Sequence, residues 1–517
     1  MIHSFELSVL PDALHDREVL RAMAADHLMM DAAEIRAVLP RKRSLDARQR
    51  HIFWRVNVDV FVGEDPPAAL PPVAWKEARP GRAVVIIGMG PAGLFAALRL
   101  LEEGVKPVIL ERGKDHRARR RDIKAIFQEH RVDPDSNFGF GEGGAGTFSD
   151  GKLYTRAGKR GDPARILRIL VQHGADADIL VDAHPHVGSD RLWRTVQSMR
   201  ETILARGGEI HFGARVDGFE IEAGRLLGVR AGGKEHRGDA VLLAAGHSAR
   251  DLFEELHRRG IPLEAKPFAL GVRIEHPQAL INRFQYRDEA KNPALPAAAY
   301  HAACQAEGRG VYSFCMCPGG LMVPAATAMG EIVINGMSMA KRNSYWANAG
   351  FVASVDANDW APWAAEGPLA GMRLQAEVEK NMAAAAGGTQ RAPAQRAQDF
   401  LKGRPSPTLP KTSYIPGHVN APLHEILPGW LVKALQEGLR QFEKKMSGFA
   451  GTDAVMVAPE SRTSSPVRIP RDPQTLMHPQ CAGLFPCGEG AGFAGGIVSA
   501  AIDGEKSAEG ILRYLGV

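Results

Sequence analysis

The chain has 517 residues, which corresponds to about three domains of ordinary size. Its composition is 45% hydrophobic and 24% charged, which excludes a chain that is disordered throughout. The net charge of +5 is too small to indicate nucleic-acid binding by itself, and five cysteines in so long a chain are not the disulfide framework of a small secreted domain.

The first residues contain no positively charged segment followed by an apolar run, so we expect no signal peptide. No stretch reaches the ~18 consecutive apolar residues that a membrane-spanning helix needs. We therefore expect a cytoplasmic protein that does not enter a membrane.

Residues 1–68 are predicted to form a small α/β domain of the ferredoxin-like kind. The segment HSFELSVL has strand character, a helical pattern follows, and IFWRVNVDVFV alternates apolar and polar side chains. Residues 69–80 and the prolines just before them are predicted to be a semi-rigid linker. The linker is expected to separate the core of this domain from the cores that follow.

The segment after the linker has the order strand, glycine turn, helix, strand. In AVVIIGMGPAGLFAALRLLEEGVKPVILE, Gly88 makes the turn, Gly90 lets a pyrophosphate approach the backbone, and Gly93 lets the helix pack closely on the strand. The helix N-terminus offers free N–H groups to phosphates. Glu111 ends the second strand, where a carboxylate accepts hydrogen bonds from an adenosine ribose. These features predict a dinucleotide-binding unit.

A second glycine-rich segment lies near the other end of the chain. GLFPCGEGAGFAGG places Gly488 and Glu489 after a strand and Gly496 before a helix. Together with GMGPAG and LLAAGHSA, this segment resembles the two-dinucleotide-binding-domain flavoproteins, which implies FAD as the cofactor. In that superfamily the acidic residue that matches Glu489 contacts the ribityl or pyrophosphate part of the flavin nucleotide.

Longer motifs narrow this resemblance. SNFGFGEGGAGTFSDGKL, ALGVRIEHPQ, YSFCMCPGG, INGMS, SRTSSPVRI and GEGAGFAGGIVSAAIDG resemble the uncharacterised bacterial FAD-dependent dehydrogenases that carry an N-terminal α/β domain. The resemblance implies an FAD-dependent oxidoreductase but does not indicate which substrate it uses.

We therefore expect an α/β fold class, in which a Rossmann-like FAD-binding domain is interrupted by a mixed α+β substrate domain. The first part of the FAD-binding domain is predicted at residues 81–271 and its C-terminal part at 446–517. The inserted substrate domain is predicted at residues 272–445.

The predicted cofactor-binding residues lie mostly in glycine-rich segments. The loop of residues 139–146 is one of them, because glycines let a backbone wrap a flat or phosphorylated ligand closely. In similar flavoproteins a loop in this place lies along the flavin. The full set is Gly88, Gly90, Pro91, Ala92, Gly93, Glu111, Arg112, Gly143, Gly144, Ala145, Gly146, Thr147, Ala245, Gly246, Gly488, Glu489, Gly495, Gly496 and Ile497.

The chain contains no second nucleotide-binding fingerprint, which argues against a separate NAD(P)H domain. NAD(P)H bound without such a domain, and other donors, stay open as the source of electrons.

Three candidate catalytic residues, Arg273, His276 and Arg462, lie where the chain is expected to leave and re-enter the FAD-binding domain. An arginine fork suits a carboxylate or phosphate, and a histidine can donate a proton opposite a hydride. These residues predict a negatively charged small-molecule substrate. The alternative is that the arginines tie the crossing segments together through Glu275 and Glu460.

Cys315 and Cys317 are so close in sequence that a disulfide between them would be strained and labile. Such a pair indicates either a redox role or two small buried apolar residues. His184 and His186 have no partner cluster that would indicate a metal, so no metal site is expected.

Basic residues are dense at 112–131 and at 41–50, which indicates either a solvated face or an RNA-binding footprint. The preferred function is an FAD-dependent oxidoreductase that passes a hydride through a non-covalent flavin to or from a small-molecule substrate. An RNA-associated flavoprotein and a non-catalytic redox sensor are the alternatives. The sequence predicts no oligomeric state.

Overall fold

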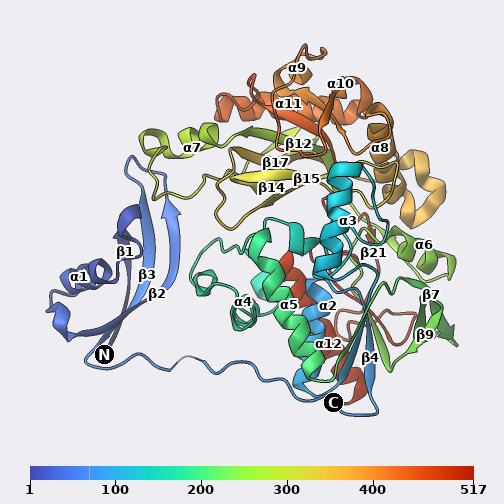
Figure 1. Ribbon diagram of the computed structural model, residues 1–517, viewed down its shortest axis with the longest axis horizontal. Helices are drawn as coiled ribbons and strands as arrows, with labels where there is room; N and C mark the ends of the chain where they lie inside the picture. The colour runs from blue at the N-terminus through green and yellow to red at the C-terminus, as the bar shows by residue number, and fades with distance from the viewer. Residues whose placement is uncertain (69, 156) are drawn as a thin grey trace.

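The computed structural model describes residues 1–68, 70–155 and 157–517. Ala69, the first residue of the expected linker, lies outside the described residues. Figure 1 shows a small sheet at the N-terminus, a parallel sheet near the bottom of the view and a large, mostly antiparallel sheet near the top.

The N-terminal sheet has three antiparallel strands in the order β1-β3-β2 and one helix packed against it. Its elements are β1 (Ile2–Val9), α1 (Arg17–Leu28), β2 (Ile35–Asp46) and β3 (Phe53–Val62). The alternation in β3 buries Val56, Val58 and Val60, as the sequence pattern predicts. This order matches the first four of the six elements of a ferredoxin-like fold. The second helix and fourth strand have no counterpart in residues 1–68, so the ferredoxin-like expectation is corrected to a three-stranded unit.

The N-terminal unit is attached to the rest of the chain by more than the linker. Arg43 forms ion pairs with Asp178 and Asp182, and its backbone N–H donates to the carbonyl of Val181 at 2.8 Å. Ile52 is buried in the core of the large sheet rather than in the core of its own unit. The linker therefore does not isolate this unit, because the unit packs on two other parts of the chain.

Five parallel strands form the second sheet, in the order β22-β10-β4-β5-β6. They are short and apolar because helices cover one face, while a three-stranded antiparallel sheet and one helix cover the other. The strands are β4 (Ala83–Ile87), β5 (Lys106–Glu111), β6 (Glu209–Phe212), β10 (Ala240–Leu243) and β22 (Leu484–Pro486). The first face carries α2 (Pro91–Glu102), α4 (Pro163–Gln172), α5 (Ser189–Ala205) and α12 (Ile497–Leu515). The second carries β7 (Val216–Glu222), β8 (Arg225–Ala231), β9 (Lys234–Arg237) and α6 (Arg250–Arg258).

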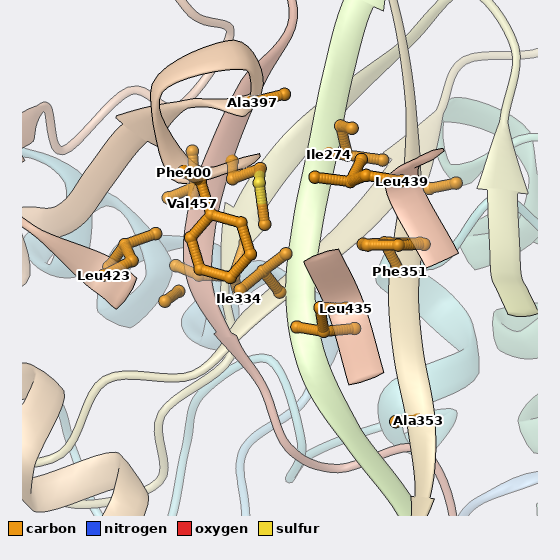
Figure 2. Close-up of a cluster of buried hydrophobic side chains, with 14 of the residues drawn as sticks. Ile274, Ile334, Phe351, Ala353, Ala397, Phe400, Leu423, Leu435, Leu439 and Val457 are labelled. Atoms are coloured by element: carbon orange, nitrogen blue, oxygen red, sulfur yellow. The ribbon is translucent and has the colours of Figure 1, made fainter. Parts of the chain in front are cut away.

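Seven strands form the large sheet, in the order β13-β14-β17-β12-β20-β18-β19, and only β18 and β19 pair in parallel. Its strands are β12 (Phe268–Pro277), β13 (Ala303–Ala306), β14 (Arg309–Cys317), β17 (Trp346–Val355), β18 (Ala392–Arg396), β19 (His418–Asn420) and β20 (Val455–Glu460). Figure 2 shows its core, where Ile274, Phe351 and Val457 from the strands meet Leu435 and Leu439 from α11 (Gly429–Lys445). The sheet begins before residue 272 and ends after residue 445, so it extends beyond both limits expected for the inserted domain.

The remaining elements connect these sheets or flank them. They are α3 (His116–Glu129), α7 (Gln278–Tyr286), α8 (Ala370–Ala385), α9 (Ala397–Leu401), α10 (Leu423–Ile426), the pair β11 (Glu264–Ala265) and β21 (Val467–Arg468), and the hairpin β15 (Gly320–Pro324) and β16 (Ile334–Ser338). Short 3₁₀ helices lie at Pro11–Ala13, Ala32–Glu34, Gly144–Phe148, Ala157–Arg160, Ala177–Leu180, Arg287–Glu289 and Ala361–Leu369.

We expect Arg43→Met to loosen the N-terminal unit without unfolding it. The substitution keeps a long side chain but removes two ion pairs, and a hydrogen bond to a charged group stabilises by about 1.5–3 kcal/mol. Hydrogen–deuterium exchange should become faster at residues 178–183 and around Ile52. The matched control is Arg41→Met, because Arg41 pairs with Asp59 inside the unit. Equal exchange at residues 178–183 in both variants would contradict this docking contact.

Candidate functional site

A cavity of about 310 Å³ opens at the carboxyl ends of the parallel strands. Its lining includes residues 87–92 after β4, 244–248 after β10 and 488–489 after β22. The strand order reverses between β4 and β10, so the connections on the two sides of this point lead away in opposite directions. Open α/β sheets bind their ligands at such a point.

The turn after β4 has the backbone geometry that the glycine fingerprint predicts. Gly88 has a φ of +99°, and a Cβ there would lie 2.6 Å from the carbonyl oxygen of Ala244. A Cβ on Gly93 would lie 2.1 Å from the carbonyl oxygen of Gly88, so α2 packs directly on the turn. A Cβ on Gly90 would meet no atom within 4 Å, and Gly90 lines the cavity. The backbone at Gly90 is therefore open to a ligand.

Glu111 ties two glycine-rich segments together at the cavity wall. Its Oε2 accepts a hydrogen bond from the backbone N–H of Met89 at 2.9 Å. Its Oε1 accepts from the N–H groups of Gly113 at 2.8 Å and Gly141 at 2.9 Å. The sequence predicted a ribose contact for this carboxylate, but the three backbone contacts were not predicted.

Arg119 holds the loop of residues 139–146 in place from inside the protein. Its guanidinium is fully buried, and burial lowers its pKa to about 10. The guanidinium donates to four backbone carbonyls at 2.8–3.0 Å, those of Asn137, Phe138, Glu142 and Gly144. The sequence analysis counted Arg119 in a basic stretch that could bind RNA, and this is corrected because the side chain is not at the surface.

The third glycine turn comes from the far end of the chain. The backbone N–H of Gly488 donates to Asp503 in α12 at 2.7 Å. Beside it, Oε2 of Glu489 lies 3.4 Å from Nδ1 of His247. His247 lines the cavity, and its Nε2 is buried and has no hydrogen-bond partner among the described residues. His247 belongs to the motif LLAAGHSA, but the sequence analysis did not name it as a site residue.

Most predicted cofactor-binding residues line this one cavity. Those that line it are Gly88, Gly90, Pro91, Ala92, Glu111, Arg112, Gly144, Ala145, Gly146, Ala245, Gly246, Gly488, Glu489, Gly496 and Ile497. Four do not, namely Gly93, Gly143, Thr147 and Gly495. Gly93 packs α2 on the turn, and the Thr147 hydroxyl donates to the carbonyl of Glu142 at 2.9 Å, so these two residues support the wall from behind.

Arg273 and His276 do not line the cavity. Arg273 is fully buried, donates to Asn348 at 2.7 Å and pairs with Glu460 at 3.0 Å. Nε2 of His276 lies 2.8 Å from the carbonyl oxygen of Phe449, and burial lowers the pKa of His276 to about 4. These placements correct the expected substrate contacts. The pair of Arg273 with Glu460 instead joins β12 to β20, which is the alternative weighed in the sequence analysis.

Arg462 does line the cavity, but its charge is compensated. It pairs with Glu331 at 3.0 Å and Glu379 at 3.1 Å, and it donates to Thr327 at 2.7 Å. Arg250 pairs with the same two carboxylates. Two guanidinium groups therefore face two carboxylates, and this network has no net charge.

The large sheet and the hairpin of β15 and β16 supply the wall opposite the glycine turns. Phe314 and Cys315 come from the end of β14, Asn335 comes from β16, and Arg462 and Thr463 follow β20. The cavity thus lies between two sheets, and small-molecule sites commonly lie between such bodies. Asn335 gave no signal in the sequence beyond its place in the motif INGMS.

Within the described ranges, no three His, Cys, Asp or Glu side chains are grouped so that they could hold a metal ion. None of the helices in the described part of the chain has the length and apolar character needed to cross a membrane.

The chain matches four protein families, and two of the matched ranges overlap at residues 267–315. Residues 82–132 match an FAD binding domain, and residues 186–315 match the family described as FAD dependent oxidoreductase. Residues 267–463 match the family described as FAD-dependent protein, C-terminal domain-like. Residues 1–61 match a domain of unknown function.

Similar proteins are found among both curated sequences and solved structures. An uncharacterized protein of Clostridium beijerinckii is 40% identical over 518 residues, which is 96% of each chain. The L-proline dehydrogenase from P. horikoshii is 12% identical over 85% of this chain and 94% of that chain, with a TM-score of 0.35. A geranylgeranyl bacteriochlorophyll reductase-like protein from Thermoplasma acidophilum is 11% identical over 84% of this chain and 80% of that chain, with a TM-score of 0.36. With identities and scores this low, the two solved structures carry no argument.

The matches to FAD-dependent families confirm the resemblance that the sequence motifs indicated. These matches also show that the chain is a flavin-dependent oxidoreductase. Its 40% identity over nearly the whole length of both proteins shows that this chain belongs to the family of FAD-dependent oxidoreductases that includes the Clostridium beijerinckii protein.

Proposed function

We propose that the chain binds FAD non-covalently in this cavity and transfers a hydride between the flavin and a small-molecule substrate. The observation that carries the proposal is the convergence of three glycine-rich segments on one cavity. They are residues 88–93, 139–146 and 488–496, which lie far apart in the sequence. A long dinucleotide needs several such close approaches of the backbone.

The residues present fit this cofactor. The N-terminus of α2 lies at the cavity and would hold the pyrophosphate, with the backbone of Gly90 giving it room. Glu111 would accept from the ribose hydroxyls while it orients the turn, because a carboxylate has more acceptor sites than its three backbone contacts use.

The domain arrangement of the proposal follows from the two larger sheets. The parallel sheet would be the FAD-binding domain, and the large sheet between β10 and β22 would be the inserted substrate domain. When bound, the flavin supplies the chemistry by accepting or giving a hydride. Phe314 on the large sheet, Asn335 on the hairpin strand β16 and Thr463 after β20 would position the substrate and exclude water from the far wall.

The proposal includes neither an anionic substrate nor a named electron donor. The anionic substrate depended on Arg273, His276 and Arg462, of which two are outside the cavity and the third is compensated by carboxylates. We propose the electron donor only by its chemical class. It would be a small molecule, for example NAD(P)H, that reaches the flavin through the same cavity.

RNA binding gains no support from the N-terminal basic residues. Arg41 pairs with Asp59, and Arg48 pairs with Asp46. Because these arginines are paired, the N-terminal unit offers less positive charge to phosphates than the number of basic residues at 41–50 indicates.

We expect the purified protein to be yellow and to release FAD when it is denatured by heat. Non-covalent binding depends on turns brought together by the fold, so unfolding removes the site. The measurement is chromatography and mass spectrometry of the supernatant. FMN or no flavin would overturn the proposed cofactor, and FAD retained on the denatured chain would overturn non-covalent binding.

We expect Gly90→Val to fold normally but to bind FAD about tenfold more weakly or worse. The Val side chain meets no protein atom at its Cβ and instead fills the space where the pyrophosphate would approach the backbone. The matched control is Gly429→Val, because a Cβ at Gly429 also meets no atom within 4 Å and that residue does not line the cavity. FAD titration and thermal unfolding check both variants, and equal FAD affinity in both would contradict the proposal.

We expect Glu111→Gln to lower FAD affinity about tenfold, because the amide nitrogen cannot accept from the backbone. A buried donor left without its partner costs about 1–3 kcal/mol, which displaces the glycine turn or the loop at residue 141. The matched control is Glu103→Gln, in a surface pair with Lys76. Calorimetric titration of FAD into the flavin-free variants checks this, and wild-type affinity in Glu111→Gln would remove the carboxylate from the site.

A further inference from the structure

Cys315 and Cys317 lie at the end of β14, on the wall of the cavity that faces the glycine turns. Cys315 lines the cavity and is partly exposed, whereas Cys317 is fully buried. The pairing of β14 with β17 shifts register between Phe314 and Cys317, and Cys315 has a φ of +42°, which a non-glycine residue rarely adopts. Strain of this kind clusters at functional positions, and here it turns both sulfur atoms toward one lysine.

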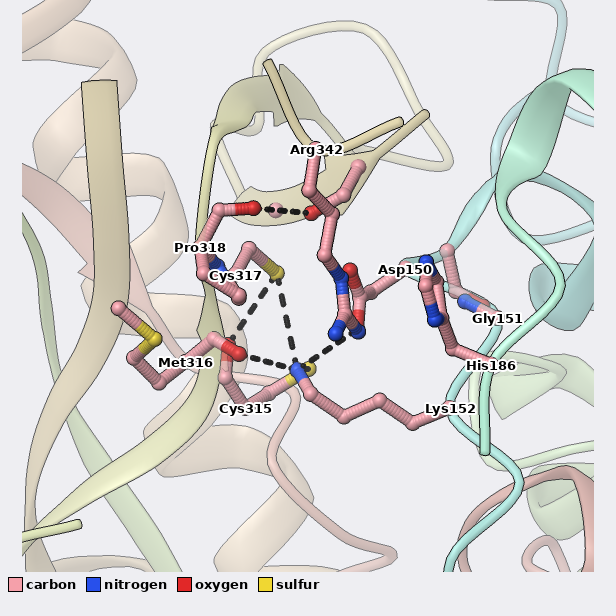
Figure 3. Close-up of polar contacts among 12 residues, drawn as sticks. Asp150, Gly151, Lys152, His186, Cys315, Met316, Cys317, Pro318 and Arg342 are labelled. Carbon is pink, nitrogen blue, oxygen red and sulfur yellow. Dashed lines mark hydrogen bonds and ion pairs between the residues drawn. The ribbon is translucent and has the colours of Figure 1, made fainter. Parts of the chain in front are cut away.

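Two cations reach the pair of sulfur atoms directly. Nζ of Lys152 lies 4.0 Å from each sulfur and donates to the carbonyl of Met316 between them (Figure 3). Nη2 of Arg273 lies 3.3 Å from Sγ of Cys317 and donates to the carbonyl of Cys315 at 2.7 Å. Arg273, which the sequence analysis assigned to substrate, is therefore a neighbour of the cysteine pair.

The cluster around the pair has more cations than carboxylates. Three cations lie in this cluster, namely Lys152, Arg273 and Arg342 (Figure 3 draws the first and the last). They face two carboxylates, because Asp150 pairs with Lys152 at 3.1 Å and Arg342 at 2.6 Å, while Glu460 pairs with Arg273. Burial raises the pKa of Glu460 to about 7 even beside Arg273, which weakens the negative side further. One thiolate would complete the balance, and buried charge is tolerated only when it is paired.

The shifts in the pKa values of the two cysteines agree with this excess of positive charge. A hydrogen bond from Cys317 lowers the pKa of Cys315 well below its usual range, as do the charges of Lys152 and Arg273, against the opposing effects of burial and Asp150. The same hydrogen bond and burial raise the pKa of Cys317. Cys315 lines the cavity, whereas the thiol of Cys317 donates to the carbonyl of Cys315 at 3.4 Å, so the cavity-side sulfur is the one placed to attack.

We propose that Cys315 and Cys317 form a redox-active dithiol, in which Cys315 is the attacking thiolate and Cys317 the resolving thiol, and that its substrates are small disulfides entering the cavity. This dithiol reaction goes beyond the proposed hydride transfer. It can be measured directly on Cys315 and Cys317.

The oxidation of the cysteine pair needs no reactant other than the small disulfide. The Cys315 thiolate attacks one sulfur of a small disulfide, the S–S bond breaks, and one thiolate leaves. Cys317 then gives up its proton and attacks the sulfur of Cys315, which releases the second thiol and forms the bond between Cys315 and Cys317. The small disulfide has gained two electrons and the protein pair has lost them. An external dithiol then reduces the bond between Cys315 and Cys317 by the reverse exchange.

The first test measures the alkylation rate of each cysteine in the purified flavin-containing protein. Iodoacetamide is applied from about pH 5 to about pH 9, a range that spans the ordinary cysteine pKa, and sites are read by peptide mass spectrometry. We expect Cys315 to react about tenfold faster than Cys304 at about pH 6. Cys304 is the matched internal control, because it is also partly exposed but burial raises its pKa. Equal rates for the two cysteines would overturn the proposal.

Variants of Lys152 separate a charge effect from a fold effect. We expect Lys152→Met to slow alkylation of Cys315 at about pH 6 by about tenfold, while Lys152→Arg keeps most of the rate. Thermal unfolding confirms that both variants are folded. An unchanged rate in Lys152→Met would overturn the role of Lys152 in holding the thiolate.

The second test uses oxidised glutathione as the disulfide. In the wild-type protein we expect the peptide with Cys315 and Cys317 to lose two hydrogen atoms and to carry no glutathione. In Cys317→Ser, glutathione should stay bound to Cys315, because the resolving thiol is missing. A stable glutathione adduct on the wild-type protein, or no reaction at all, would overturn the dithiol. Neither result affects FAD release or Gly90→Val, so a failure here is distinguishable from a failure of the proposed function.

Discussion

The close approach of backbone to backbone around the cavity is the constraint on which the site depends. A Cβ on Gly88 would lie 2.6 Å from the carbonyl oxygen of Ala244, and one on Gly490 would lie 2.6 Å from that of Gly246. Because these contacts leave no room for a side chain, β4, β10 and β22 can bring their turns together at one edge of the sheet. The cavity is therefore walled largely by backbone on this side, which suits a ligand held through phosphates and hydroxyls.

Buried arginines fix the segments that these turns connect. Arg119 binds the carbonyls of the loop at residues 139–146, Arg273 joins β12 to β20, and Arg462 joins the segment after β20 to α8 through Glu379. Each guanidinium presents several donors in a planar fork, so one side chain can satisfy several acceptors at once. A lysine has only three donors on one nitrogen, which is too few for the four carbonyls around Arg119. These arginines hold segments of the protein together. The guanidinium groups of Arg273 and Arg462, which the sequence assigned to an anionic substrate, are therefore already paired with protein carboxylates.

The two walls of the cavity have different chemical characters. The wall from the parallel sheet presents glycine backbone, Glu111 and the helix N-terminus of α2. The opposite wall presents Phe314 and Cys315 from the large sheet and Asn335 from the hairpin strand β16. A cofactor held by the first wall would thus face side chains of the second, and substrate chemistry would depend on the residues that the large sheet contributes. The charged cluster behind Cys315 gives that second wall a reactive group of its own.

The sequence by itself determined those features that depend on a few neighbouring residues. The alternation in β3 and the strand, turn and helix from Ala83 to Glu102 were predicted correctly, since side-chain periodicity and the need for glycine at positive φ are local properties. The pairing of β22 with β10 and the contact of Lys152 with Cys315, 163 positions away, were decided only by the tertiary structure. For Arg273 the sequence left a substrate contact and a tie to Glu460 both open, and only the tertiary structure showed the tie; the burial of His276 against Phe449 was not predicted at all. The physical reason is that burial and charge pairing depend on which distant segments pack together, and no local pattern contains that information.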